Sequence, residues 1–375
     1  YSLNIAPLET WSFRIVHIAG ALVLGFVLFA GARFVSSEEG GARHRWTTWI
    51  SAGAMLPALY VLYQTFSFWQ MVQNGAMRIP VELEVWHFGW PLLAATGVGI
   101  VMSWFHQRER SVFSVPDLVL IVCSLAVAAY FLVVYNTSMR MSTGTSFAPV
   151  GISFAAIAGT ALIMELTRRV AGMALVIIGL VFLAYVFAGP YLPGFLGYPG
   201  LSVQRFFSQV YTDAGILGPT TAVSSTYIIL FIIFAAFLQS SKVGDYFVNF
   251  AFAAAGRSRG GPAKVSIFAS GLMGMINGTS AGNVVSTGSL TIPLMKKVGY
   301  SKQSAGAVEA AASTGGQIMP PIMGAGAFIM AEITGIPYTE IAIAAIIPAI
   351  LYFASVYFMV DFEAAKTGMR GMRED

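Results

Sequence analysis

Apolar residues recur in long runs along most of the chain. A helix that crosses a lipid bilayer needs about 20 apolar residues in a row. Runs of this kind, separated by short polar or basic stretches, predict eight membrane-spanning helices near 14–35, 46–66, 88–106, 116–135, 149–167, 172–189, 222–240 and 338–360. The pattern therefore predicts an all-α, multi-pass membrane protein.

The pattern changes between residues 262 and 333. This region stays apolar but is rich in Gly, Ser, Thr, Asn and Pro, which weaken an uninterrupted helix. Just before it, residues 243–255 are apolar and are followed by Arg257 and Arg259. We predict that 243–255 forms a helix lying along the cytoplasmic membrane interface.

Composition and charge support a membrane protein and set its orientation. Only 10% of the residues are charged, whereas soluble domains carry about 25%. Of the 21 Lys and Arg residues, only Arg14, Arg78, Arg140 and Arg205 fall on one side of the predicted membrane. Basic residues accumulate on the cytoplasmic side, so the remaining Lys and Arg residues are predicted to be cytoplasmic. Their short clusters between apolar runs argue against a nucleic-acid partner.

The charges also predict a re-entrant helical hairpin at 262–297. Lys264 and the pair Lys296–Lys297 fall on the same side, although the segment between them is apolar enough to enter the bilayer. The Gly278–Gly282 stretch marks the tip. Peptide groups exposed there are tolerated at membrane depth only where protein, water or an ion supplies partners. The alternative is that these small residues merely allow close helix packing.

A second interruption predicts a broken membrane helix at 303–333. Gly315 and Gly316 lower helix propensity, and Pro320 with Pro321 removes backbone donors. We expect the helix to unwind there and to free carbonyl groups beside Ser313 and Thr314. The alternative is a simple proline kink.

These two features together favour an ion and carboxylate site. Carbonyl and hydroxyl oxygens suit a hard cation such as Na⁺, and helix N-termini suit a carboxylate. Thr279 and Ser280 provide hydroxyl ligands, whereas Asn277 and Asn283 are expected to brace the hairpin turn.

Ionisable residues within apolar segments are functional candidates. Glu309 precedes the unwound segment, where it either partners a proton or cation or, as we favour, braces the hairpin through a hydrogen bond. Glu332 is predicted to be interfacial. Glu165 precedes Arg168 and Arg169 and is predicted to form an ion pair on the surface.

No enzyme motif accompanies these features. The four histidines are scattered without metal-ligand spacing, and neither a nucleotide-binding loop nor a catalytic carboxylate pair is present. We therefore expect no enzyme activity, no cofactor and no metal other than the coupling ion.

Three stretches, 277–299, 303–332 and 337–363, resemble the large membrane subunit of tripartite ATP-independent periplasmic (TRAP) transporters. The segments NVVSTGSLTIPLMKKVGY, AGAVEAAASTGGQIMPPIMGAGAFIMAE and IPAILYF look like the fused-permease branch, which works with TAXI-type binding proteins. The resemblance covers roughly residues 165–375. Residues 1–145 resemble the family's small four-helix subunit only in layout.

The resemblance implies an elevator-type importer of the bacterial inner membrane, driven by a Na⁺ or H⁺ gradient and supplied with a carboxylate solute by a periplasmic binding protein. The substrate site that it implies is Asn277, Gly278, Thr279, Ser280, Asn283 and Pro320. The implied ion site is Gly278, Ser280, Ser313, Thr314, Gly315 and Gly316.

Ordinary spans with aromatic belts precede residue 146 and the unusual features follow it, so we predict a domain boundary at 145/146. The resemblance implies that residues 1–145 form a membrane scaffold and that residues 146–375 form the first half of the transport domain. The family's large subunit has two inverted repeats, each with a hairpin and a broken helix, whereas these residues carry one set. The second half is thus an expected partner, together with the binding protein and membrane lipid. The alternatives are a non-transporting scaffold subunit and a channel.

Overall fold

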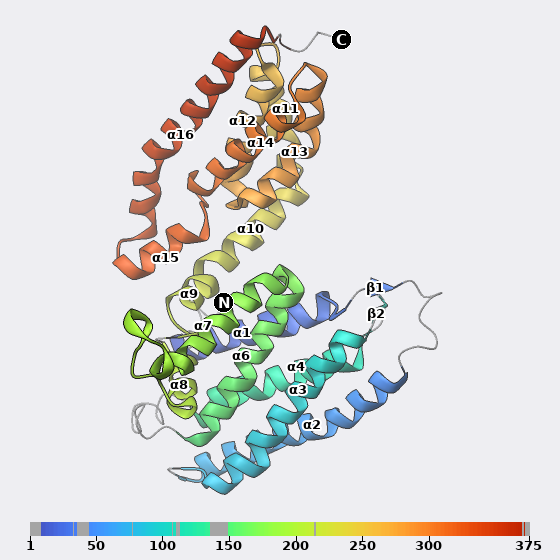
Figure 1. The fold of residues 1–375 in the computed structure, drawn as a ribbon, viewed down its shortest axis with the longest axis vertical. Helices are drawn as coiled ribbons and strands as arrows, with labels where there is room; N and C mark the ends of the chain where they lie inside the picture. Colours follow the sequence, from blue (N-terminus) through green and yellow to red (C-terminus); the bar gives the residue numbers. More distant parts are fainter. Residues whose placement is uncertain are drawn as a thin grey trace. The chain divides into compact units, whose positions relative to one another are not determined.

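The computed structural model is almost entirely helical (Figure 1). It describes residues 9–32, 34–35, 45–76, 78–106, 108–109, 113–135, 149–213, 215–369 and 371. The chain divides into two compact units, Tyr1–Thr221 and Ala222–Asp375. Each unit has its own packed interior and is considered by itself.

The first unit is a bundle of long helices. Its helices are α1 (Thr10–Leu28), α2 (Arg45–Gln73), α3 (Trp90–Phe105), α4 (Val115–Ala129), α6 (Val150–Ala171), α7 (Met173–Ala188) and α8 (Val203–Val210). Short π-helical segments, η1 (Leu83–Gly89) and η2 (Tyr130–Val134), and 3₁₀ turns, η3 (Gly189–Tyr191) and η4 (Gly194–Leu196), join or extend them. Strands β1 (Phe34–Val35) and β2 (Arg108–Glu109) form a short parallel pair. Phe68, Phe88 and Phe131 lie fully buried in the core.

The second unit contains the two features that the sequence singles out. Its elements are α9 (Pro219–Val223, at the boundary), η5 (Ser224–Ile228), α10 (Ile229–Ser240), α11 (Val243–Ala255), α12 (Gly261–Asn277), α13 (Ser280–Lys297), α14 (Lys302–Gly315), η6 (Gly316–Ile318), α15 (Ala325–Thr334) and α16 (Tyr338–Thr367). Helices α12, α13 and α14 pack on one another, α11 packs on α12, and α16 packs on α12 and α14. The helix predicted at 243–255 is present as α11, and its place at the membrane interface stays a prediction.

Seven helical segments of the described chain are long and apolar enough to span a membrane. They are Thr10–Leu28, Leu83–Phe105, Val115–Val134, Val150–Ala171, Met173–Tyr191, Pro219–Leu238 and Tyr338–Thr367. Each corresponds to a predicted span. The remaining prediction, 46–66, lies in α2, which is 29 residues long but less apolar than the other seven.

Some predictions fall on residues that the structure does not describe. The predicted domain boundary at 145/146 lies there, so the assignment of 1–145 and 146–375 to different domains stays a prediction. The basic residues Arg33, Arg43, Arg110, Arg140, Arg370 and Arg373, together with His44, also lie outside the described residues.

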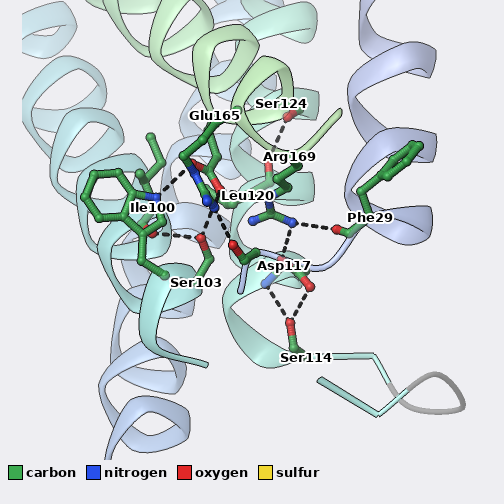
Figure 2. A network of polar contacts seen from close by, with 12 residues as sticks. Phe29, Ile100, Ser103, Ser114, Asp117, Leu120, Ser124, Glu165 and Arg169 are labelled. Carbon is green, nitrogen blue, oxygen red and sulfur yellow. Dashed lines mark hydrogen bonds and ion pairs between the residues drawn. The ribbon is translucent and has the colours of Figure 1, made fainter. Parts of the chain in front are cut away.

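A buried network of charged groups joins four helices of the first unit (Figure 2). Glu165 of α6 is only 3% exposed, and it accepts hydrogen bonds from Ser103 Oγ at 3.2 Å and Trp104 Nε1 at 2.9 Å. Arg168 and Arg169 both form ion pairs with its carboxylate. The predicted ion pair is present, but its predicted surface position is wrong because neighbouring helices cover this face of α6.

Arg169 extends the network to two further elements. Its guanidinium donates to Asp117 Oδ1 of α4 at 2.7 Å and to the Phe29 carbonyl, which follows α1, at 2.9 Å. Ser114 caps α4 by accepting from the Asp117 backbone N–H. These bonds fix the ends of α1, α3, α4 and α6 to one another (Figure 2).

The opposite end of α6 is held by a second buried carboxylate. Glu84 is 1% exposed and accepts from Tyr130 Oη at 2.8 Å and from the Gly151 backbone N–H at 3.1 Å. Pro149, at the N-cap of α6, gives no side-chain cap. Glu84 therefore caps α6 from another helix, where a negative charge is favoured.

Candidate functional site

Helices α12 and α13 form a helical hairpin. Gly278 ends α12 in the left-handed conformation, with φ 59°, and Thr279 is extended before α13 begins. The two arms contain 17 and 18 residues, so each is about 25 Å long at 1.5 Å per residue. Arms that pack along each other around a two-residue turn return the chain to the end where it started, as the sequence predicts. Entry of this hairpin into a membrane stays a prediction.

The helix that follows the hairpin is broken, as the sequence also predicts. Helix α14 ends at Gly315, one 3₁₀ turn (η6) follows, and α15 begins only at Ala325. The Pro320–Pro321 peptide bond within the break is cis. Because helical structure resumes so far along the chain, the break is longer than a proline kink.

The tip of the hairpin lies directly against this break. A Cβ atom added to Gly278 would lie 2.2 Å from the Met323 carbonyl oxygen, so only glycine fits. Gln317 Nε2 donates to Ser280 Oγ at 2.9 Å, which ties the break to the first residue of α13. The tip and the break, which the sequence analysis combined in one candidate site, are thus in contact.

The paired glycines of the break face different neighbours. A Cβ atom on Gly274 of α12 would lie 2.3 Å from Gly316 Cα, so the two backbones touch. A Cβ atom on Gly315 would instead meet Tyr352 and Phe353 of α16, each at 2.7 Å. The glycines therefore permit the break to fit between the hairpin and α16.

A cavity of about 710 Å³ opens where the tip meets the break. Its lining residues are Gly278, Thr279, Ser280, Ala281, Gln317, Ile318, Met323, Gly324, Ala325, Gly326, Ala327, Met330, Ile341 and Ala345. None of these residues is charged. The polar surface comes from Thr279, Ser280 and Gln317 and from backbone groups.

Two helices begin at the wall of this cavity. Ser280 is the first residue of α13 and Ala325 is the first residue of α15, and both line the cavity. The first N–H groups of a helix have no partner within it and carry partial positive charge. The cavity can therefore bind an anion without a basic side chain.

The two predicted asparagines lie outside the cavity wall. Asn277 Nδ2 contacts Ser286 Oγ at 3.4 Å, across the two arms. Asn283 is fully buried, and its Nδ2 donates to the Ser270 carbonyl at 2.8 Å. Its Oδ1 accepts no hydrogen bond from the residues that the structure describes.

The other predicted residues lie in the broken helix. Ser313 is buried and donates to Glu309 Oε1 at 3.2 Å. The exposed Thr314 donates to the Ala310 carbonyl of its own helix at 2.7 Å. Pro320 lies in the break but not in the cavity wall.

Glu309 lies in the interior of this unit, surrounded by hydroxyl groups. It is fully buried, and its carboxylate accepts hydrogen bonds from both hairpin arms and from its own helix. The contacts are Thr287 Oγ1 at 2.5 Å, Thr291 Oγ1 at 2.5 Å, Ser266 Oγ at 2.7 Å, Ser313 Oγ at 3.2 Å and Ser270 Oγ at 3.5 Å. Glu309 thus bonds α12 and α13 to α14.

Ion pairs hold the base of the hairpin. Lys264, which is 4% exposed, pairs with Asp361 of α16 at 2.6 Å, and Arg259 also pairs with Asp361.

Burial, together with the nearby charges of Glu363 and Asp361, raises the pKa of Tyr300 to about 12. Tyr300 is therefore neutral at physiological pH.

Sequence reasoning missed several of these residues. It did not place Gln317 at the tip, and it overlooked the hydroxyls around Glu309. One signal was available, because Ser266 with Ser270, and Thr287 with Thr291, are four residues apart and so share a helix face.

Comparison with known proteins places residues 158–375, more than half of the chain, in one family. They match the family described as "Tripartite ATP-independent periplasmic transporter, DctM component". A protein of Vibrio cholerae serotype O1 (strain ATCC 39315 / El Tor Inaba N16961) named "C4-dicarboxylate TRAP transporter large permease protein DctM" is 37% identical over 91 residues, or 24% of this chain and 20% of that protein.

Two further relatives are more distant. A protein of the same name from Rhodobacter capsulatus is 30% identical over 151 residues, covering 40% of this chain and 34% of that protein. The "Uncharacterized protein y4mL" of Sinorhizobium fredii (strain NBRC 101917 / NGR234) is 25% identical over 138 residues, covering 37% and 32%. The chain thus matches only between a fifth and about a third of the length of these relatives.

Proposed function

The chain belongs to the family of DctM components of tripartite ATP-independent periplasmic transporters. We propose that it is part of the membrane permease of an ion-driven importer and supplies the first hairpin and the first broken helix of its transport domain. The chain is a multi-pass protein of the bacterial inner membrane and not an enzyme. In this proposal a periplasmic binding protein delivers a carboxylate solute, and a sodium gradient drives its uptake.

The observation that carries the proposal is the cavity between the hairpin tip and the break. Two helices begin at its wall, and Ser280 and Gln317 supply further polar groups. Helix N-termini bind carboxylates in the broken helices of transporters. The uncharged lining favours an anion that is held by backbone N–H groups and released readily, as transport requires.

The substrate that we propose is a small dicarboxylate. Two relatives carry the name C4-dicarboxylate transporter. The cavity has one helix N-terminus on the hairpin and one on α15, so each can bind one carboxylate group of the same solute.

The coupling ion that we propose is Na⁺, bound beside the cavity. Gly278, Ser280, Ser313, Thr314, Gly315 and Gly316 are its proposed ligand region. Of these, Thr314 donates its hydroxyl proton within its own helix. One monovalent cation that moves down a potential of 100 mV releases about 2.3 kcal/mol, so a few ions suffice for accumulation without ATP.

The finer organisation also belongs to the proposal. We place the chain in the fused-permease branch that works with TAXI-type binding proteins. The N-terminal helices would act as the membrane scaffold, and the hairpin with its broken helix would move as an elevator. A second repeat would supply the other half of the substrate site.

Uptake by the complete transporter in proteoliposomes tests the proposal. We expect dicarboxylate uptake to require the binding protein and to stop when choline replaces sodium. Sodium should also protect the backbone amides of residues 278–316 from hydrogen exchange. If the complete transporter takes up no dicarboxylate and sodium does not change the exchange of these amides, the alternative of a non-transporting scaffold subunit is favoured.

A further inference from the structure

The Glu309 carboxylate has no basic partner. Five hydroxyl groups contact it, from α12, α13 and its own helix, and among the described residues no Lys, Arg or His pairs with it. By contrast, Asp361 near the base of the hairpin forms ion pairs with both Arg259 and Lys264. Glu309 is therefore a different kind of acidic group.

The hydroxyl groups around Glu309 can each act as a donor to its carboxylate. Thr287 Oγ1 and Thr291 Oγ1 each lie 2.5 Å from a carboxylate oxygen. An ionised carboxylate offers about four lone-pair sites, all of them acceptors, and four of the five hydroxyls lie within 3.2 Å. Hydroxyl dipoles can solvate a negative charge at this position but do not neutralise it.

An unused acceptor lies next to the same network. Ser270 contacts Glu309 through its hydroxyl and accepts from Asn283 Nδ2 through its carbonyl. Asn283 Oδ1 is buried and accepts no hydrogen bond within the described residues. The Asn283 amide lies against Gly316, where the helix break begins. A buried acceptor without a partner is costly, unless a ligand occupies the space beside it.

We propose that Glu309 is the fixed counter-charge for the coupling cation, acting through Ser270 and Ser313 rather than by direct contact. Asn283 Oδ1 is the ligand atom on the side of the hairpin. A single negative charge matches one monovalent cation, and oxygen ligands select a hard one. Glu309 is thus a positioning residue that sets cation affinity. This inference rests on the proposed sodium coupling.

The matched substitution is Glu309→Gln, which keeps the size and most acceptor capacity but removes the charge. In complete transporter reconstituted with its binding protein, we expect the sodium concentration for half-maximal uptake to rise on the order of tenfold. The substrate KM measured at saturating sodium should stay close to the wild-type value. A purely structural role would instead lower the maximal rate at all sodium concentrations.

Two controls accompany this variant. Glu340→Gln removes an exposed carboxylate from the first turn of α16 and is expected to leave sodium dependence unchanged. If Glu309→Gln does not accumulate in the membrane, Glu309→Asp and Glu309→Asn are compared. Glu309→Asp keeps the charge, so it should reach half-maximal uptake at a lower sodium concentration than Glu309→Asn.

The results separate this inference from the proposed function. If wild-type uptake does not depend on sodium, the proposed coupling fails and this inference falls with it. In the other outcome, wild-type uptake depends on sodium while Glu309→Gln has the sodium dependence of the wild type, or while Glu309→Asp and Glu309→Asn have the same sodium dependence as each other. In either case Glu309 is not the counter-charge.

Discussion

Gln317 donates a hydrogen bond to Ser280 across 2.9 Å, and this bond links the broken helix to the start of the second hairpin arm. Both residues line the cavity at the hairpin tip. A change in the conformation of the break would therefore move a residue that contacts the N-terminus of α13, where we propose that substrate binds.

Substitution of either partner should weaken substrate binding. A hydrogen bond of this kind contributes about 1 kcal/mol, so Gln317→Ala and Ser280→Ala should each raise the KM for uptake roughly fivefold. The double variant should lose little more than either single variant, because both remove the same bond. Ser240→Ala, whose hydroxyl bonds within α10, is the control. Fully additive losses in the double variant would show that the two residues act independently.

Gly278→Val should abolish uptake without preventing membrane insertion. The substitution places a β-branched side chain at φ 59° and drives its Cβ atom into the Met323 carbonyl, 2.2 Å away. The matched control is Gly335→Ala, which also has positive φ, at 70°, but open space around it. Uptake assays and membrane fractionation measure both effects. Wild-type uptake by Gly278→Val would contradict the tip geometry.

Gly274→Ala should lower the thermal stability of the protein. Its new methyl group would lie 2.3 Å from Gly316 Cα, so the hairpin and the break must separate. Overpacking of this kind costs about 1–3 kcal/mol. Gly306→Ala lies on a helix with nothing within 4 Å and should instead be neutral or stabilising by up to about 1 kcal/mol. Thermal unfolding in detergent compares the two, and equal melting temperatures would refute the contact.

Glu165→Gln should destabilise the first unit strongly. Removing one member of a buried ion network leaves Arg169, whose side chain is fully buried, without its full counter-charge. Losses of about 3–5 kcal/mol are typical of such changes, and the amount of protein in the membrane should fall. Asp213→Asn is the comparison, because Asp213 is 58% exposed in its pair with Arg14 and exposed pairs contribute about 0–1 kcal/mol. Similar membrane levels for both variants would argue against the network in Figure 2.

The sequence by itself determined the helical class, seven of the spans, the hairpin tip at Gly278 and the break at Gly315 and Gly316. These features follow from local causes. Spanning helices need long apolar runs, and Gly or Pro residues interrupt helices wherever they stand. Neighbouring segments have little influence on either.

Only the tertiary structure decided which side chains meet. It buried Glu165 beneath other helices, directed the Thr314 hydroxyl back to its own helix, and placed Gln317 against Ser280. Membrane helices are apolar on almost every face, so hydropathy does not reveal which face packs. That choice depends on close contacts such as Gly274 with Gly316, between residues far apart in the sequence.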